Sequence, residues 1–268
     1  MKSYGILEQT ESLSALGLAA EELRIQGYTF LRNVLNAEEL AEARVRLDRV
    51  YSTQEQSKGP EYLEEIGEAN LARMPLLYDE WFLKLATQER LLELVRSVIG
   101  NYVVLHLQNG IINQPDEVHH QSSWHRDLPY QNWTSSKPLA LGSIFCIDDF
   151  SEETGGTLVL PHSHREEICP SKEYLTNHEQ TVNAPAGSVI VFDAMLFHRA
   201  GRNCSKGPRR AINNVFTVPI LKQQIDLPAA LAGKHRSDPE LAQLLGYDCA
   251  VSESVEAWRE TKHLRNQG

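Results

Sequence analysis

The chain of 268 residues has few cysteines, no long apolar run and no excess of basic charge. Its four cysteines lie far apart without a Cys-x-x-Cys spacing, so neither a disulfide framework nor a zinc knuckle is predicted. Reduced thiols in a cytosol are the simplest interpretation. No apolar run approaches the ~20 residues of a membrane span, and residues 1–10 lack the apolar segment of a secretory signal. We therefore expect a cytoplasmic protein that does not interact with membranes.

The charge balance points away from polyanionic partners. The formal net charge is -10, whereas nucleic-acid or anionic-membrane binding requires a basic patch or stripe. Internal repeats and low-complexity tracts are also missing. Hydrophobic residues make up 41% of the chain, which is enough for a sizeable core. We predict a single domain over residues 1–268 that acts on a small molecule and binds no nucleic acid; the oligomeric state is not predicted.

The first hundred residues are expected to form a mainly helical layer, at about residues 18–100. Its predicted elements are a helix at Leu18–Gln26 that ends at Gly27, a strand at Tyr28–Leu31, a helix capped by Asn36 that runs to about Tyr51, a polar loop at 52–62, and a helix in one or two pieces at Pro75–Ile99.

The middle of the chain changes to short β-branched runs with turn signals and no helices between them, which predicts an antiparallel sandwich or barrel. We assign a β core to about 101–220, with strands at Val103–Leu107, Leu139–Ile147, Thr157–Leu160, Val189–Phe192 and Ala211–Val218. Helices at Pro239–Leu245 and Ser252–His263 are expected in a C-terminal part, 228–268. The predicted fold class is mainly β with flanking helices.

One motif in the β region contains residues that could bind a metal ion. Trp124-His125-Arg126-Asp127 is followed by Phe197-His198-Arg199, in which His198 stands 71 residues after Asp127. Two histidines and one carboxylate can cover one face of an octahedral iron(II) and leave the opposite face open. A two-residue offset puts His125 and Asp127 on the same side of an extended strand, and we expect His198 to end a strand at 195–198. The bare pattern also fits three ordinary structural residues.

Arg209 adds a fourth element, 11 residues after His198. A planar guanidinium can hold a carboxylate through two parallel hydrogen bonds. Because Arg209 and Arg210 alternate across a predicted strand, one should point into the barrel and the other outward. Taken singly, either arginine also fits an ordinary surface ion pair.

At this point the chain resembles the phytanoyl-CoA dioxygenase family of iron(II)/2-oxoglutarate oxygenases, from about Leu18 to Leu227. The residues that carry the resemblance are Gly27-Tyr28-Thr29-Phe30-Leu31, Trp124-His125-Arg126-Asp127, Gly155-Gly156-Thr157-Leu158-Val159-Leu160-Pro161-His162-Ser163-His164, Pro185-Ala186-Gly187-Ser188-Val189, Phe197-His198-Arg199-Ala200-Gly201-Arg202-Asn203 and Arg209-Arg210-Ala211. The chain has His162 where relatives usually carry glycine in Pro-Gly-Ser-His, which bears on the local turn and not on the iron site.

The resemblance implies a double-stranded β-helix, or jelly-roll, core. It implies that His125, Asp127 and His198 are the catalytic iron(II) ligands and that Arg209 holds the C5 carboxylate of 2-oxoglutarate. Asn109 is matched to a further polar contact with the co-substrate. Halogenases of this class replace the carboxylate ligand by Gly or Ala, so Asp127 favours insertion of oxygen from O₂.

The predicted activity is hydroxylation of an unactivated C–H bond of a small, polar metabolite, with release of succinate and CO₂. Loops at 114–123 and 164–179 are expected to shape the mouth of the pocket. We interpret His119 and His120 as solvated loop residues, and His106 and His164 as groups that support the ligands.

Two alternatives stay open. A cupin-like hydrolase or isomerase could use zinc or manganese on the same three ligands, but it would need neither Arg209 nor O₂. A non-catalytic small-molecule binding module would not need to keep all four residues.

Overall fold

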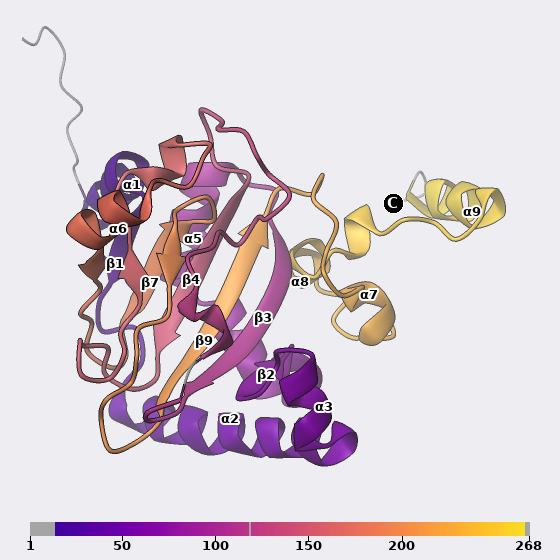
Figure 1. Ribbon diagram of the computed structural model, residues 1–268. Coiled ribbons are helices and arrows are strands. Elements are labelled where there is room, and N and C mark those ends of the chain that lie inside the picture. Colours follow the sequence, from indigo (N-terminus) through magenta and orange to yellow (C-terminus); the bar gives the residue numbers. More distant parts are fainter. Residues whose placement is uncertain (1–13, 118, 266–268) are drawn as a thin grey trace, which may run out of the picture.

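Two antiparallel sheets form the centre of the protein (Figure 1). The computed structural model describes residues 14–117 and 119–265. A six-stranded sheet has the order β1-β7-β4-β9-β3-β2, and a three-stranded sheet has the order β6-β5-β8. The strands are β1 Tyr28–Leu31, β2 Leu71–Arg73, β3 Val104–Asn113, β4 Ala140–Cys146, β5 Leu158–Val159, β6 Gln180–Thr181, β7 Val189–Asp193, β8 His198–Arg199 and β9 Arg209–Thr217. Antiparallel sheets flanked by helices confirm the predicted class.

Strand β9 lies between β3 and β4 in the larger sheet, and its register decides which side chains face the smaller sheet. Asn213 pairs with Asn109 on β3, and Arg209 pairs with Asn113. Because side chains alternate along a strand, Arg209 and Asn213 point to the same face as Ala211. Ala211 belongs to an apolar cluster between the sheets, together with Ile111, Ile144, Cys146, Phe150, Val159 and Val182.

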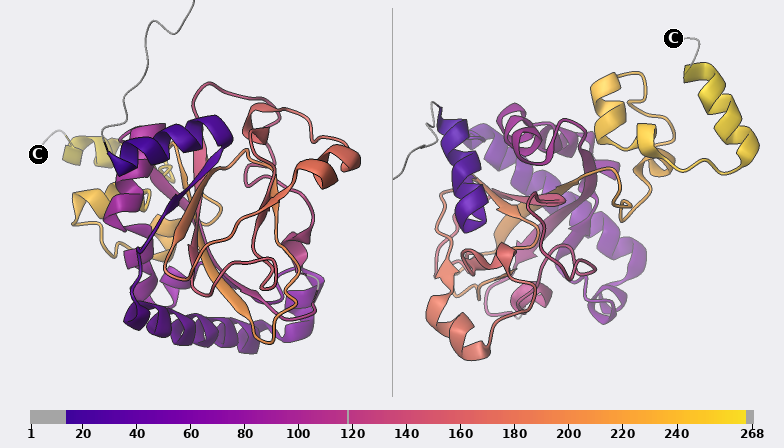
Figure 2. Two further views of the ribbon diagram at one scale, coloured as in Figure 1. Left: turned by 90° about the vertical axis from the view of Figure 1, so that its left-hand side faces the viewer. Right: turned by 90° about the horizontal axis from the view of Figure 1, so that it is seen from above.

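Helices cover the other face of the larger sheet (Figure 2). The α-helices before β3 are α1 Ala15–Gln26, α2 Ala37–Lys58, α3 Pro60–Glu65, α4 Leu83–Ala86 and α5 Glu89–Ile99. Their apolar side chains share one core with the sheet, and the buried members include Leu23, Leu47, Leu91, Leu141, Phe145, Ile212 and Phe216. This core fixes the sheet and leaves its opposite face for the functional site.

Two predicted helix boundaries are confirmed. Gly27 ends α1 in the left-handed conformation, with φ of 90°, which glycine adopts without steric cost. Asn36 caps α2, where its side chain accepts from the backbone of Glu39 and the Glu39 carboxylate accepts from the backbone N–H of Asn36. Such a reciprocal cap contributes on the order of 1 kcal/mol.

The predicted polar loop at 52–62 is wrong, because α2 continues to Lys58 and α3 starts at Pro60. Polar Gln, Glu and Lys residues are good helix formers, and a contact from elsewhere in the fold stabilises the extension. The Gln54 side chain donates to the Arg73 carbonyl at 2.7 Å and accepts from the Arg73 N–H at 2.8 Å. Sequence periodicity does not reveal such a pair.

The predicted helix at 75–99 is broken into more pieces than expected. Two 3-10 helices, η1 Pro75–Leu77 and η2 Glu80–Phe82, precede α4 and α5. Asp79 and Gln88 each accept a backbone N–H at the start of a new helix, so side-chain capping interrupts the apolar pattern. The end at Ile99 is as predicted. Strand β3 runs on to Asn113, six residues beyond its predicted end.

The segment at 164–179, expected to be a loop, contains helix α6 Lys172–His178 after a 3-10 helix η4 Ser163–Arg165. The loop at 114–123 includes the 3-10 helix η3 His120–Ser122. His119 is buried, so its interpretation as a solvated residue is wrong; the side chain of His120 lies outside the described residues.

The C-terminal part is helical, as predicted. It contains α7 Leu227–Ala230, α8 Pro239–Leu244, the 3-10 helix η5 Tyr247–Cys249 and α9 Val255–Arg265. In Figure 1, α9 stands apart from the sheets. Among the described residues, no helix combines the length and the apolar character needed to cross a bilayer. The division of residues 1–268 into one domain with three parts stays our proposal.

Candidate metal centre

His125 and His198 are brought together by a single antiparallel β-bridge. The backbone N–H of each donates to the carbonyl of the other, at 3.0 and 3.1 Å, and the ring centroids are 4.3 Å apart. The expected strands around them are shorter than predicted. Residues 194–196 form a turn, and β8 begins only at His198. One bridge is nevertheless sufficient to set the two imidazoles side by side.

Asp127 completes a cluster of three possible metal ligands. Its backbone N–H donates to the carbonyl of Ala194 at 3.0 Å, although residues 125–127 form no regular strand. The Asp127 Oδ1 lies 3.5 Å from Nε2 of His198, and one ligand atom from each residue lies within 4.8 Å of the other two. The three side chains can therefore share one ion.

The polar atoms of this cluster lack partners in a way that fits a metal. Nε2 of His125 and Oδ2 of Asp127 are buried without a hydrogen bond, and a buried polar group without a partner costs about 1–3 kcal/mol. A cation bound by these atoms would remove that cost. Two imidazoles and one carboxylate are also the ligand set of non-haem iron(II) centres.

The second nitrogen of each histidine is held by the backbone. Nδ1 of His125 lies 2.8 Å from the Ser123 carbonyl, and Nδ1 of His198 lies 3.0 Å from the Leu196 carbonyl. A carbonyl oxygen can only accept a hydrogen bond, so each Nδ1–H donates and each Nε2 keeps its lone pair for a metal. Burial lowers the pKa of His198 despite the opposing effect of Asp127, which favours the neutral form that a metal ligand requires.

Arg209 is a buried cation with an incomplete set of partners. It is 3% exposed, its Nη2 donates to the Gly155 carbonyl at 2.9 Å, and its Nε has no hydrogen bond. The guanidinium carbon lies 4.3 Å from the ring centroid of Phe150. Burial lowers the pKa of Arg209 to about 10, so it remains protonated near neutral pH. No carboxylate of the described residues lies within 4 Å of it, although a buried charge normally requires a counter-charge.

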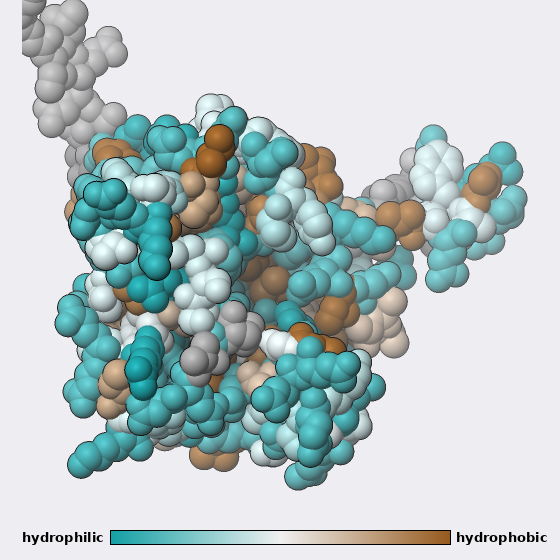
Figure 3. All heavy atoms as spheres, viewed as in Figure 1, coloured by the Kyte–Doolittle hydropathy of each residue, from teal (hydrophilic) through white to brown (hydrophobic). Residues whose placement is uncertain are grey.

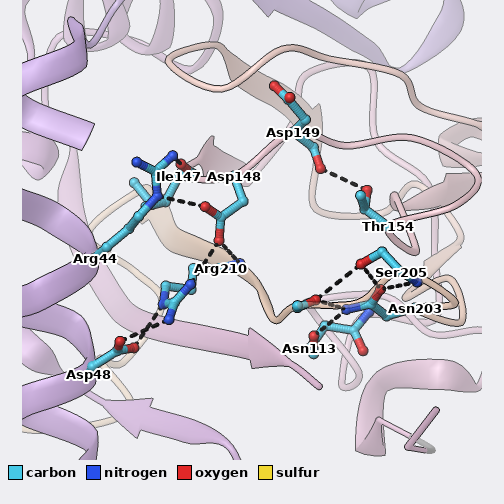
Figure 4. A network of polar contacts seen from close by, with 11 residues as sticks. Arg44, Asp48, Asn113, Ile147, Asp148, Asp149, Thr154, Asn203, Ser205 and Arg210 are labelled. Carbon is cyan, nitrogen blue, oxygen red and sulfur yellow. Dashed lines mark hydrogen bonds and ion pairs between the residues drawn. The ribbon is translucent and has the colours of Figure 1, made fainter. Parts of the chain in front are cut away.

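Arg210 contrasts with its neighbour, as the predicted alternation requires (Figure 4). It points away from the space between the sheets and forms two hydrogen bonds of 2.8 Å to the carboxylate of Asp48 on α2. Its Nη1 also lies 3.2 Å from Asp148, which in turn accepts from Arg44. These ion pairs tie the start of β9 to α2 and so hold the backbone that carries Arg209.

Arg209 and both histidines line the same small cavity between the sheets. The other lining residues are Ile111, Gln121, Ile144, Thr157, Arg199, Ala200 and Asn213. The free space is about 20 Å³, so a small organic acid would bind there only if the surrounding side chains moved apart. Asn213 was not predicted. Its Oδ1 is buried without a hydrogen bond, and its place four residues after Arg209 on one strand could have indicated the shared face.

Asn109 lies opposite Asn213 on β3, but it does not line this cavity. Its Oδ1 accepts from Nη1 of Arg73 at 3.2 Å. Arg73 is also paired with Glu68 and lies 3.1 Å from Oε1 of Gln224. Contact between Asn109 and a co-substrate therefore stays a prediction.

The two histidines expected to support the ligands lie in different places. His106 is the extra residue of a β-bulge in β3, between Leu105 and Leu107. Burial lowers the pKa of His106, and the charge of Asp127 opposes this, so the two side chains lie near enough to interact. The ring of His164 instead lies near Gly27 at the end of α1, with Nε2 3.4 Å from the Arg24 carbonyl.

Comparison with known proteins supports the resemblance seen in the sequence. The profile of the phytanoyl-CoA dioxygenase family matches residues 23–211. An uncharacterized protein of Mycobacterium tuberculosis is 34% identical over 96% of each chain. The ectoine dioxygenase of Nocardia farcinica is 24% identical over 72% of this chain and 73% of its own.

Solved structures of iron and 2-oxoglutarate enzymes share the fold. EctD from S. alaskensis, with 2-oxoglutarate and 5-hydroxyectoine bound, covers 80% of this chain and 79% of its own with a TM-score of 0.63 at 20% identity. The epimerase SnoN, in complex with Fe³⁺, α-ketoglutarate and nogalamycin RO, covers 76% and 84% with a TM-score of 0.59 at 21% identity. The predicted jelly-roll core is thereby confirmed.

Proposed function

Because this chain belongs to the phytanoyl-CoA dioxygenase family of iron/2-oxoglutarate oxygenases, we propose that it hydroxylates a C–H bond of a small polar metabolite. The balanced reaction consumes the metabolite, 2-oxoglutarate and O₂, and gives the alcohol, succinate and CO₂. The observation that carries the proposal is one cavity in which two histidines of the ligand cluster face a buried arginine without a counter-ion.

His125, Asp127 and His198 would hold the iron. Iron bound by this set supplies the activation of O₂, coupled to oxidative decarboxylation of 2-oxoglutarate. The chain contributes fixed ligand orientation, because the Ser123 and Leu196 carbonyls determine which nitrogen of each imidazole is free. Preset ligands avoid reorganisation during the reaction.

Arg209 would bind the remote carboxylate of 2-oxoglutarate. Its Nε is unused, and its guanidinium is held between the Gly155 carbonyl and the face of Phe150. A charge-assisted pair in this buried place is stronger than one in water. The apolar side chains of Ile111 and Ile144 line the same cavity and would keep water from the co-substrate.

The metabolite itself would approach from the side of Asp127 and His106. On the face shown in Figure 3, hydrophilic residues surround a central hollow with hydrophobic residues at its floor. On and beside β3, His106 lies near Asp127, and Arg73, Asn109 and Gln224 form a linked set of polar side chains. Nδ1 of His106 is buried without a partner. These groups support a polar metabolite over a long acyl chain.

Two observations weigh against the alternatives. A zinc or manganese hydrolase would have no use for the buried charge of Arg209, and a simple binding module would not need a carboxylate with an unsatisfied buried oxygen beside two imidazoles. Retention of Asp127 leaves no vacant ligand position of the kind that halogenases use for chloride. SnoN is an epimerase, so the identity of the product has to be measured.

The test is anaerobic titration of the purified protein with iron(II) and 2-oxoglutarate, followed by the weak visible charge-transfer absorption of the chelate. We expect a saturable band that is lost in Asp127→Ala and is weakened in Arg209→Ala. Failure of the wild-type protein to develop the band would refute the proposal. Change of the band on addition of candidate metabolites, followed by mass analysis for a gain of one oxygen atom, would then identify substrate and reaction.

A further inference from the structure

A second cavity lies near the end of β7, between α1, α5, η4 and residues 135–138. Its volume is about 430 Å³, within the range of small-molecule sites. It shares no lining residue with the cavity of the metal centre. Helices α1 and α5 pack against each other on one side of it (Figure 2). The residues used below are Ala20, Leu23, Val98, Lys137, Arg165 and Asp193.

Asp193 is a buried carboxylate with one free oxygen. It is 6% exposed, and its Oδ1 accepts from the backbone N–H of Met195 at 2.8 Å. Among the described residues, Oδ2 receives no hydrogen bond, and no cationic group lies within 4 Å. Burial raises the pKa of Asp193 to about 6, so the group is mainly ionised at neutral pH. The carboxylate therefore lines the cavity with one oxygen that accepts no hydrogen bond from the described residues and is available to a donor on a ligand.

Basic side chains line the same cavity without neutralising Asp193. The charges of Arg126 and Arg165 lower the pKa of Asp193. Neither binds the carboxylate directly, because Nε of Arg126 donates to the Met195 carbonyl at 2.8 Å and Nη2 of Arg165 donates to the Arg24 carbonyl at 2.7 Å. Lys137 also lines the cavity, and among the described residues no carboxylate pairs with it. The cavity therefore offers separate sites for a cationic and an anionic group, close to each other.

The remaining wall is partly apolar; Glu21 and Arg24, which pair with each other at 3.5 Å, also line it, as do Ser97, Ser135, Ser136 and His164. Ala20 and Leu23 on α1 and Val98 on α5 line the cavity together with Pro138, and Leu23 is fully buried. A purely cationic ligand would meet repulsion from Lys137 and Arg165, and a purely anionic one from Asp193. A polyol would leave the apolar wall without a partner. An aliphatic molecule with adjacent charges of both signs matches the free carboxylate oxygen, the basic side chains and the apolar part of the lining.

We propose that this cavity binds a small aliphatic amino acid or a zwitterion of that kind. Its ammonium group binds Asp193, its carboxylate binds Arg165 and Lys137, and its side chain packs against Leu23 and Val98. The site is separate from the oxygenase reaction and does not depend on it.

The cavity adjoins the metal centre through one turn. The Asp193 side chain holds the N–H of Met195, and the next carbonyls of this turn hold the metal-ligand segment. The Ala194 carbonyl accepts from Asp127 at 3.0 Å, and the Leu196 carbonyl accepts from Nδ1 of His198 at 3.0 Å. A ligand on Asp193 thus contacts the turn that positions two of the three metal ligands.

The test is isothermal titration of the full-length protein with L-alanine, L-valine and L-leucine. L-Leucinamide, which lacks the carboxylate, and 2-hydroxy-4-methylpentanoate, which lacks the ammonium group, are the matched probes. We expect saturable binding of at least one amino acid and at least tenfold weaker binding of both matched probes. Absence of saturable binding by all three amino acids would overturn the proposal.

Variants locate the binding. Asp193→Asn keeps the acceptor for Met195 and removes the charge, and Lys137→Met removes a charge at the rim of the cavity without disturbing the core. Each should weaken binding at least tenfold. The controls Asp116→Asn and Lys222→Met change the same charges at exposed positions outside the cavity and should bind like the wild type. Unchanged affinity in both cavity variants would refute the assignment.

Discussion

Asp193 makes a quantitative prediction about stability that needs neither metal nor ligand. Its folded-state pKa is about 6, compared with an ordinary value of 3.8. Because the folded pKa is raised, the folded protein binds the proton more tightly, and stability falls as pH rises from about 4 to about 6. At ~1.4 kcal/mol per pH unit, the ionised carboxylate lowers the free energy of unfolding by about 3 kcal/mol at pH 8 and by about 1 kcal/mol at pH 4.5.

Asp193→Asn removes the charge and keeps an oxygen acceptor for the N–H of Met195. We expect the variant to exceed the wild type in unfolding free energy by roughly 3 kcal/mol at pH 8 and by roughly 1 kcal/mol at pH 4.5. Urea denaturation of both proteins at the two pH values measures the difference, in which the titration of all other groups cancels. Asp116→Asn, at an exposed position, should show no such dependence. A gain that is the same at both pH values, or a less stable variant at pH 8, would refute the assigned burial cost.

Three further predictions concern binding of 2-oxoglutarate. Arg209→Ala should raise the KM for 2-oxoglutarate by about 30-fold or more, because loss of one partner of a buried charge pair costs at least ~2 kcal/mol; an unchanged KM would remove Arg209 from this role. Asp148→Asn, which weakens the ion pairs of Arg210 outside the cavity, should raise that KM several-fold at nearly constant kcat, whereas a purely structural effect would lower the active fraction without changing KM. Asn213→Ala should weaken 2-oxoglutarate binding by about fivefold, as expected for one hydrogen bond of ~1 kcal/mol, in equilibrium titration with iron(II); wild-type affinity would show that Asn213 does not contact the co-substrate.

Local patterns were sufficient to predict the parts of the site that share one strand or one motif. The alternation of Arg209 and Arg210 depends only on strand geometry, and the structure shows one inside and the other paired with Asp48. The pairing of the ligand histidines required more than the pattern. It depends on a bridge between residues 73 positions apart in the sequence, which short-range periodicity cannot reveal.

Two of the wrong predictions share a physical cause, which is the tertiary structure overriding local preference. Gln54 extends α2 because it pairs with the backbone of Arg73 on β2. His119 is buried although its loop is polar. Asp193 belongs to no sequence motif that predicts a site, and only the cavity beside it indicates that its carboxylate could bind a ligand.

Buried charges that lack a partner within the chain differ in role from those that are paired: we assign the first to ligand binding and the second to stability of the fold. Arg209 and Arg210 have the same chemistry and adjacent backbones, yet Arg210 has two carboxylates and Arg209 has a carbonyl and an aromatic face. A paired buried charge can stabilise the fold when its geometry is good, whereas an unpaired one lowers stability, a cost that proteins often carry at functional sites. Asp193 is likewise buried, and one oxygen of its negatively charged carboxylate accepts no hydrogen bond from the described residues. The two incomplete charges therefore mark two places where ligands belong, one between the sheets and one beneath α1.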